Sequence, residues 1–168
     1  MRFEDEFIEF AEAASPRLRR TAYLLCGDWH LAEDLVQSAL ARVFVAWRRI
    51  RHQDSAHAYA TRTLTNCYLA DRRRKRPIEV LTDRFPERVT GAPAPETRLM
   101  ILGALAALPA RSRAVVVLRY WADLSIEETA EVLGCSAGNV RSQSVRALSK
   151  LRTALSDLNE ATTERKGN

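Results

Sequence analysis

The chain has 168 residues, of which 46% are hydrophobic and 28% charged, a composition typical of one globular domain or two small ones. The longest uncharged apolar stretch, residues 99–110, has 12 residues, whereas spanning a bilayer takes about 20. Residues 1–6 are acidic and contain no apolar segment of the kind that a secretory signal needs. We therefore expect no membrane insertion and a cytoplasmic protein.

The net charge of +5 is unevenly distributed. Residues 1–41 carry 4 basic and 8 acidic side chains, whereas residues 42–88 carry 12 basic and 5 acidic ones. An acidic beginning followed by a basic middle predicts two partner surfaces of opposite preference, one of them for a polyanion.

The sequence offers little support for a metal site or an enzyme. Cys26, Cys67 and Cys135 are widely spaced, and none of the three histidines lies at ligand spacing from them. They are predicted to be small buried residues. The sequence contains no glycine-rich phosphate loop and no nucleophile elbow, so we expect no catalytic residue, no cofactor and no small-molecule substrate.

Residues 1–76 are predicted to form four helices. Ser15 and Pro16 look like an N-cap and a first helical residue, Gly27 stops the second helix, and Asp28 caps the third. A polar turn, residues 51–55, precedes the fourth helix, which runs into the basic residues 72–76. The first three helices are predicted at residues 3–14, 17–26 and 29–50, and the apolar stripe of the third comprises Leu31, Leu35, Ala39, Val43, Trp47 and Ile50.

A proline-rich linker, residues 77–95, separates this block from a second helical block. Ser125 and Glu128 form the pattern of a capping box, and Gly134 ends the short helix that follows. A short helix, a tight turn and a longer helix are typical of a helix-turn-helix. The helices are predicted at residues 96–108, 112–121, 125–134 and 137–155, followed by a disordered tail at 157–168. The fold class is therefore all-α, with two small helical domains joined by a flexible linker.

The last helix has two distinct faces. No acidic residue occurs between Glu131 and Asp157, and arginine suits guanine and phosphate. Val140, Ser144, Ala147, Leu148 and Leu151 are predicted to pack inward; Asn139, Arg141, Ser142, Val145, Arg146 and Ser149 lie on the opposite side. This face predicts a helix that enters the major groove of DNA.

Two motifs resemble a known family. Residues 27–37, GDWHLAEDLVQ, and the run that ends at Ala46-Trp47 are similar to region 2 of bacterial RNA polymerase sigma factors. Residues 107–120 (ALPARSRAVVVLRY), 124–134 (LSIEETAEVLG) and 138–142 (GNVRS) are similar to region 4. Their order, with only a linker between them, resembles the two-domain extracytoplasmic-function (ECF) group of the sigma-70 family.

The resemblance implies roles for particular residues. Region 2, residues 1–76, would bind the β′ clamp helices of core RNA polymerase and recognise and melt the −10 element; region 4, residues 96–156, would read the −35 element and contact the β flap. The polymerase-binding candidates are Glu33, Asp34, Leu35, Gln37, Ser38 and Arg42. The −10 candidates are His52, Gln53, Asp54, Ser55, Arg62, Asn66, Arg72, Arg73 and Arg74, with Tyr68, Lys75 and Arg76 beside them. The −35 candidates are Asn139, Arg141, Ser142, Val145, Arg146 and Lys150.

The chain departs from the family pattern at three places. Ser38 follows Gln37 where an acidic residue is usual, Asn66 precedes Asp71 by five positions rather than four, and Gln143 replaces a frequent arginine. The resemblance also raises an anti-sigma protein as a further partner.

Two other functions compete with this interpretation of the sequence. The helix-turn-helix pattern alone also fits an autonomous transcriptional regulator that binds DNA without polymerase. The acidic and polar segment 33–38 and the basic end of the fourth helix favour the sigma factor, because a sensor or dimerisation domain has little use for them. An enzyme is disfavoured by the missing catalytic motifs.

Overall fold

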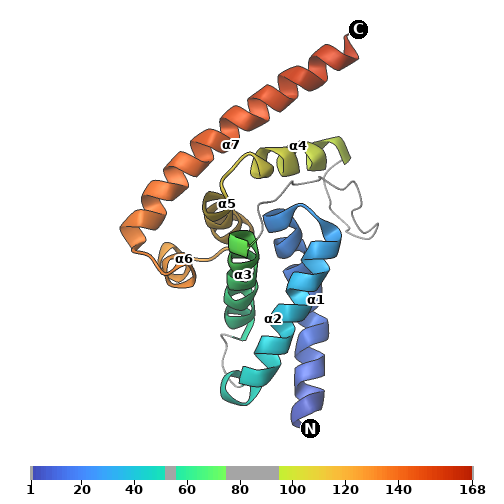
Figure 1. Ribbon diagram of the computed structural model, residues 1–168, viewed down its shortest axis with the longest axis vertical. Helices are drawn as coiled ribbons and strands as arrows, with labels where there is room; N and C mark the ends of the chain where they lie inside the picture. The colour runs from blue at the N-terminus through green and yellow to red at the C-terminus, as the bar shows by residue number, and fades with distance from the viewer. Residues whose placement is uncertain (1, 52–55, 75–94, 168) are drawn as a thin grey trace. The chain divides into compact units, whose positions relative to one another are not determined.

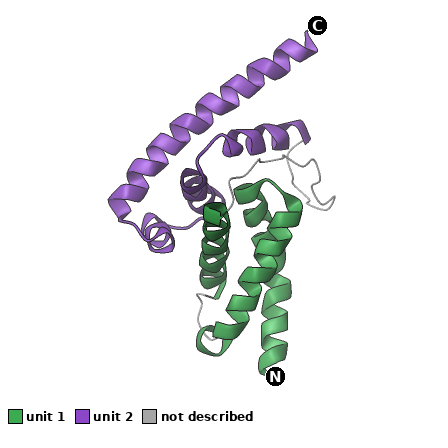
Figure 2. Ribbon diagram, viewed as in Figure 1, with its two compact units in different colours: residues 1–78 green, residues 79–168 purple. Residues whose placement is uncertain are grey.

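The computed structural model describes residues 2–51, 56–74 and 95–167. These residues form helices and connecting turns, and the chain divides into two compact units, residues 1–78 and 79–168 (Figures 1 and 2). The predicted all-α class is confirmed for the described residues. The linker 77–95 lies outside them except for Pro95, which begins a helix.

The described residues of unit 1 form three helices rather than the four predicted: α1 (Phe3–Cys26), α2 (Trp29–Ile50) and α3 (Ala56–Arg74). The predicted break at Ser15 and Pro16 is wrong, since α1 continues through both residues. The Ser15 hydroxyl donates to the Ala11 carbonyl (2.5 Å) within the helix instead of capping a new one. The tertiary contacts made by both halves of α1 outweigh the local signal.

The start of α1 packs against the end of α2, so the two helices are antiparallel. The rings of Phe7 and Phe10 lie 5.5 and 4.8 Å from that of Trp47, and Phe3 lies 5.7 Å from Phe44. The predicted stripe of α2 is buried at every position except Leu31, which is half-buried. Asp28 caps α2 as predicted, accepting from the Leu31 amide (3.1 Å).

Unit 2 contains α4 (Pro95–Ala106), α5 (Ala110–Val116), the π-helical turn η1 (Val117–Trp121), α6 (Ile126–Leu133) and α7 (Ala137–Lys166). The predicted helix 112–121 is therefore an α-helix that widens into a π-helix. The Ala122 amide donates to the Val117 carbonyl (2.9 Å), which is the i to i+5 bond of that geometry.

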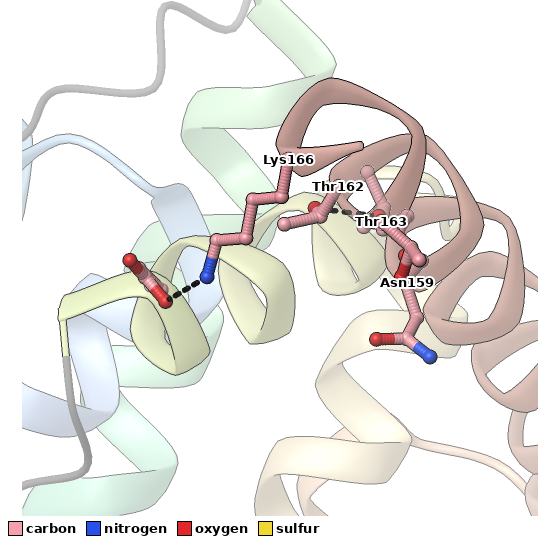
Figure 3. A network of polar contacts seen from close by, with 6 residues as sticks. Asn159, Thr162, Thr163 and Lys166 are labelled. Carbon is pink, nitrogen blue, oxygen red and sulfur yellow. Dashed lines mark hydrogen bonds and ion pairs between the residues drawn. The ribbon is translucent and has the colours of Figure 1, made fainter. Parts of the chain in front are cut away.

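The expected disordered tail is wrong, because α7 continues to Lys166. Its second half packs against α4, where the Leu158 side chain lies against Gly103. Figure 3 shows the last turns of α7, where Lys166 reaches Glu96 of α4 (3.3 Å) and the Thr162 and Thr163 hydroxyls donate to backbone carbonyls one turn earlier. Apolar contact with α4 supplies the order that the polar composition of this segment did not predict.

Candidate nucleic-acid and polymerase interfaces

The helix-turn-helix of unit 2 is built by local caps. The Ser125 hydroxyl accepts from the Glu128 amide (3.0 Å), and the Glu128 carboxylate accepts from the Ser125 amide (2.6 Å). The capping box is therefore confirmed, and it fixes the first turn of α6. Gly134 ends α6 with φ of 64°, a conformation that favours glycine. Ser136 then caps α7 by accepting from the Asn139 amide (3.1 Å).

The predicted inward face of α7 packs as expected. Val140, Ser144 and Ala147 are buried, and Leu148 and Leu151 are half-buried. All six −35 candidates are exposed on the remaining surface, and Val145 is 71% exposed. A side chain as apolar as valine in that position is suited to contact a thymine methyl group in the major groove.

One acidic group does approach this face, although the helix itself carries none there. Glu127 of α6 lies 3.8 Å from Arg141, with both side chains largely exposed. The acid-free run in the sequence could not show this contact, because the carboxylate comes from the preceding helix. The exposed pair leaves Arg141 able to exchange this partner for a phosphate or a base.

Three other arginines of unit 2 serve the fold. Arg113 is 2% exposed and donates to the carbonyls of Ala106 and Leu108 (3.3 and 3.2 Å). Arg111 donates to the Leu133 carbonyl (2.6 Å), and Arg119 to the Leu124 carbonyl (2.5 Å). These bonds satisfy carbonyls in the turns around α5 and at the end of α6.

The −10 candidates on α3 are divided by burial. Arg62, Asn66 and Arg73 are exposed and share one face, at spacings of four and seven residues. Arg74 is exposed and Arg72 is half-buried. Tyr68, by contrast, is fully buried in the core of unit 1, so its ring cannot stack on a base. His52, Gln53, Asp54, Ser55, Lys75 and Arg76 lie outside the described residues.

The polymerase-binding candidates also divide. Asp34, Gln37, Ser38 and Arg42 are exposed on α2, whereas Leu35 is 5% exposed and packs in the core, where it supports the helix without reaching a partner. The Glu33 carboxylate pairs with Arg19 of α1 (2.7 Å).

Sequence reasoning missed an apolar part of the same helix. Val45 is 85% exposed and Phe44 40% exposed. Val45 continues the exposed line of Asp34 and Ser38 at helical spacing, so the surface changes from acidic to apolar along α2. The signal was available, because Val45 falls outside the buried stripe.

Two of the three cysteines are buried, as predicted for structural residues. Cys26 and Cys67 are buried, and Cys135 is half-buried. Burial raises the pKa of the Cys67 thiol, and the positive charge of Arg42 opposes this shift. Within the described ranges, no cluster of histidine, cysteine and carboxylate side chains could hold a metal ion, and no helix could span a membrane.

Comparison with known proteins places this geometry in a family. Residues 10–78 match Sigma-70 region 2, and residues 98–151 match Sigma-70, region 4. The RNA polymerase sigma-E factor of Streptomyces coelicolor is 38% identical over 152 residues, covering 89% of this chain and 86% of that protein. The ECF RNA polymerase sigma factor EcfG of Rhodopseudomonas palustris is 30% identical, covering 85% and 81%. This chain belongs to the ECF sigma factors of the sigma-70 family.

The fold agrees with this assignment. The sigma factor RpoE of Bartonella quintana, solved in complex with the anti-sigma factor NepR, has a TM-score of 0.74 at 24% identity, with 89% of this chain and 96% of that chain covered. As an ECF sigma factor, the protein binds core RNA polymerase and promoter DNA and acts in promoter-specific initiation. The comparisons favour this function over the autonomous regulator.

Proposed function

We propose that the two units divide promoter recognition between them. Unit 2 reads the −35 element through the exposed face of α7, and unit 1 recognises and melts the −10 element through α3 and the candidates at 52–55, which lie outside the described residues. The domain limits proposed for these tasks are residues 1–76 and 96–156, with 77–95 as the linker. The observation that carries the proposal is the face of α7 on which all six −35 candidates are exposed, held in place by two capped turns.

The exposed line on α2 is the proposed docking site for core polymerase. Asp34, Gln37 and Ser38 supply polar and acidic contacts, and Val45 supplies apolar area. We assign this surface to the β′ clamp helices and a second contact, on unit 2, to the β flap. An anti-sigma protein that covered the α2 surface would block this docking; the RpoE of Bartonella quintana, a protein of similar fold, is solved with the anti-sigma factor NepR.

The −10 surface rests on Arg62, Asn66 and Arg73. Two guanidiniums on either side of an amide, along one exposed helix face, suit the backbone of a separated DNA strand. The protein itself needs no catalytic residue and no cofactor, since polymerase performs the chemistry. We propose that it acts in the cytoplasm, where core polymerase and promoter DNA lie.

Run-off transcription tests the proposal. Core RNA polymerase is given a pool of promoter fragments with and without this protein, and transcripts that appear only with the protein establish the function. Arg146→Ala should reduce these transcripts, whereas Arg152→Ala, an exposed change two turns away on the same helix, should reduce them less. Specific DNA shifts by the protein alone, with no transcripts, would favour an autonomous regulator and contradict the docking role of α2.

A further inference from the structure

Two amide side chains on α7 form a pair whose orientation affects how DNA is read. Gln143 Nε2 donates to Asn139 Oδ1 (2.5 Å) across one helical turn. Asn139 is exposed and Gln143 half-buried, on the side of α7 that also carries Arg146. Gln143 was not among the residues predicted to contact DNA.

The position of Asn139 is fixed by its surroundings. Its backbone amide donates to the Ser136 cap, which places it in the first turn of α7. In a recognition helix, residues of the first turns approach base edges. The preceding residue, Gly138, has no side chain, and a Cβ there would meet only Ser136 Oγ, at 3.9 Å.

The bond to Gln143 decides which end of the Asn139 amide faces outward. The oxygen and the nitrogen of a planar amide diverge from one carbon, so an oxygen turned toward Gln143 turns the nitrogen away from it. The outward group is then Nδ2 with its two hydrogens, which can only donate. An asparagine that reads adenine needs both its oxygen and its nitrogen at the base edge.

We infer that Gln143 is a positioning residue that makes Asn139 a donor to guanine at one base pair of the −35 element. Guanine presents two acceptors in the major groove, O6 and N7, which match the two hydrogens of Nδ2. The inference rests on the proposed role of α7 and adds a base preference to it. Phosphate oxygens are acceptors too, so the test must separate a base from the DNA backbone.

The test reverses the amide. In Gln143→Glu, a carboxylate replaces the donor and can only accept, so it should attract Nδ2 and turn Oδ1 outward. The full-length variant is combined with core polymerase and a promoter library in which the −35 region is randomised. We expect the wild-type protein to select guanine at one position. Gln143→Glu should shift that position about tenfold toward the bases that present a donor in the major groove, adenine and cytosine.

Three control variants separate the possible causes. Gln143→Leu removes the orienting bond without adding charge and should relax the preference at that position only. Asn139→Ala should abolish it there while the other positions keep theirs. Thr153→Glu adds the same charge to an exposed site two to three turns further along α7 and should weaken binding without changing any base preference.

The outcomes distinguish this inference from the proposed function. If wild-type protein yields no transcripts from the library, the proposed function fails. If wild-type protein selects promoters but Gln143→Glu shows the same preferences at every position, the positioning role is wrong. If Asn139→Ala weakens all sequences equally, Asn139 contacts phosphate and the guanine assignment is overturned.

Discussion

The arginines of α5 and η1 and those of α7 belong to one unit of the molecule but do different work. Arg111, Arg113 and Arg119 each donate to a backbone carbonyl of a turn or a helix end. Arg141 and Arg146 are exposed on α7. All carry the same charge, and the sequence composition counts them alike. The comparison shows that net charge indicates a polyanionic partner but does not say which cations reach it.

The largest expected effect lies in the first group. Replacing Arg113 with methionine removes the donor to the Ala106 and Leu108 carbonyls inside the fold. We expect the free energy of unfolding to fall by about 3 kcal/mol, because buried carbonyls lose a partner. Urea denaturation followed by circular dichroism measures this change. Arg152→Met, at an exposed position, is the control and should change stability by less than about 0.5 kcal/mol. Equal stabilities would contradict the structural role of Arg113.

Arg146→Ala should show the opposite behaviour. We expect promoter affinity of the polymerase complex to fall about tenfold, since a good arginine–guanine contact contributes about 1–3 kcal/mol. The free energy of unfolding should stay within about 0.5 kcal/mol of the wild-type value. Binding measured over a series of salt concentrations sharpens the result: a lost phosphate contact reduces the salt dependence by about one counterion, whereas a lost base contact does not. A destabilised protein with unchanged affinity would place Arg146 with the arginines that serve the fold.

Two glycines near the turn extend the comparison between folding and recognition. Gly134 has φ of 64°, so Gly134→Ala should destabilise the protein by about 1 kcal/mol.

Gly138 has no positive φ, and an added Cβ would meet only Ser136 Oγ. Gly138→Ala should therefore stabilise the helix by about 0.5 kcal/mol while reducing DNA affinity, because the new methyl group stands between the first turn of α7 and the DNA. Thermal unfolding and promoter binding of both variants test this; unchanged affinity in Gly138→Ala would mean that DNA does not approach the first turn.

The smallest effect is expected at the end of α7. The side chains of Lys166 and Glu96 are 68% and 71% exposed, so their ion pair is strongly solvated. Lys166→Ala should change the free energy of unfolding by less than about 0.5 kcal/mol. Leu158→Ala, which removes the apolar contact with Gly103, should cost about 1 kcal/mol. Urea denaturation of both variants compares them. If Lys166→Ala lowered the free energy of unfolding more than Leu158→Ala, an exposed cation would stabilise unit 2 as the buried Arg113 does.

Much of the local structure could be predicted because its signals lie within a few residues of each other. The cap at Asp28 and the capping box of Ser125 and Glu128 each depend on side chains within one backbone turn, and the stop at Gly134 depends on a positive φ that glycine adopts readily. The exposed face of α7 follows from helical spacing alone. The −35 candidates were therefore all placed on the surface, as their positions in the sequence predicted.

The misplaced elements depend on contacts between distant residues. Ser15 and Pro16 carry a convincing start signal, yet packing of Phe7 and Phe10 against Trp47 keeps α1 continuous. Leu35 and Tyr68 were assigned to partner surfaces, but the core encloses both. Spacing had already placed Leu35 in the buried stripe of α2, and only the family resemblance assigned it to a partner surface. The continuity of α1 and the burial of Tyr68 cannot be derived from spacing, because they depend on what the rest of the chain places opposite these residues.

The sequence by itself determined the helical class, the caps at Asp28 and Ser125, the two family motifs and the faces of α7, since these follow from local hydrogen bonding and periodicity. Only the tertiary structure decided which arginines are committed to carbonyls, which candidate residues are enclosed, and that α7 runs on to Lys166 along α4. These features depend on desolvation and on contacts between residues far apart in the chain. Whether a guanidinium or a leucine is buried is decided by the residues packed around it, not by its residue type.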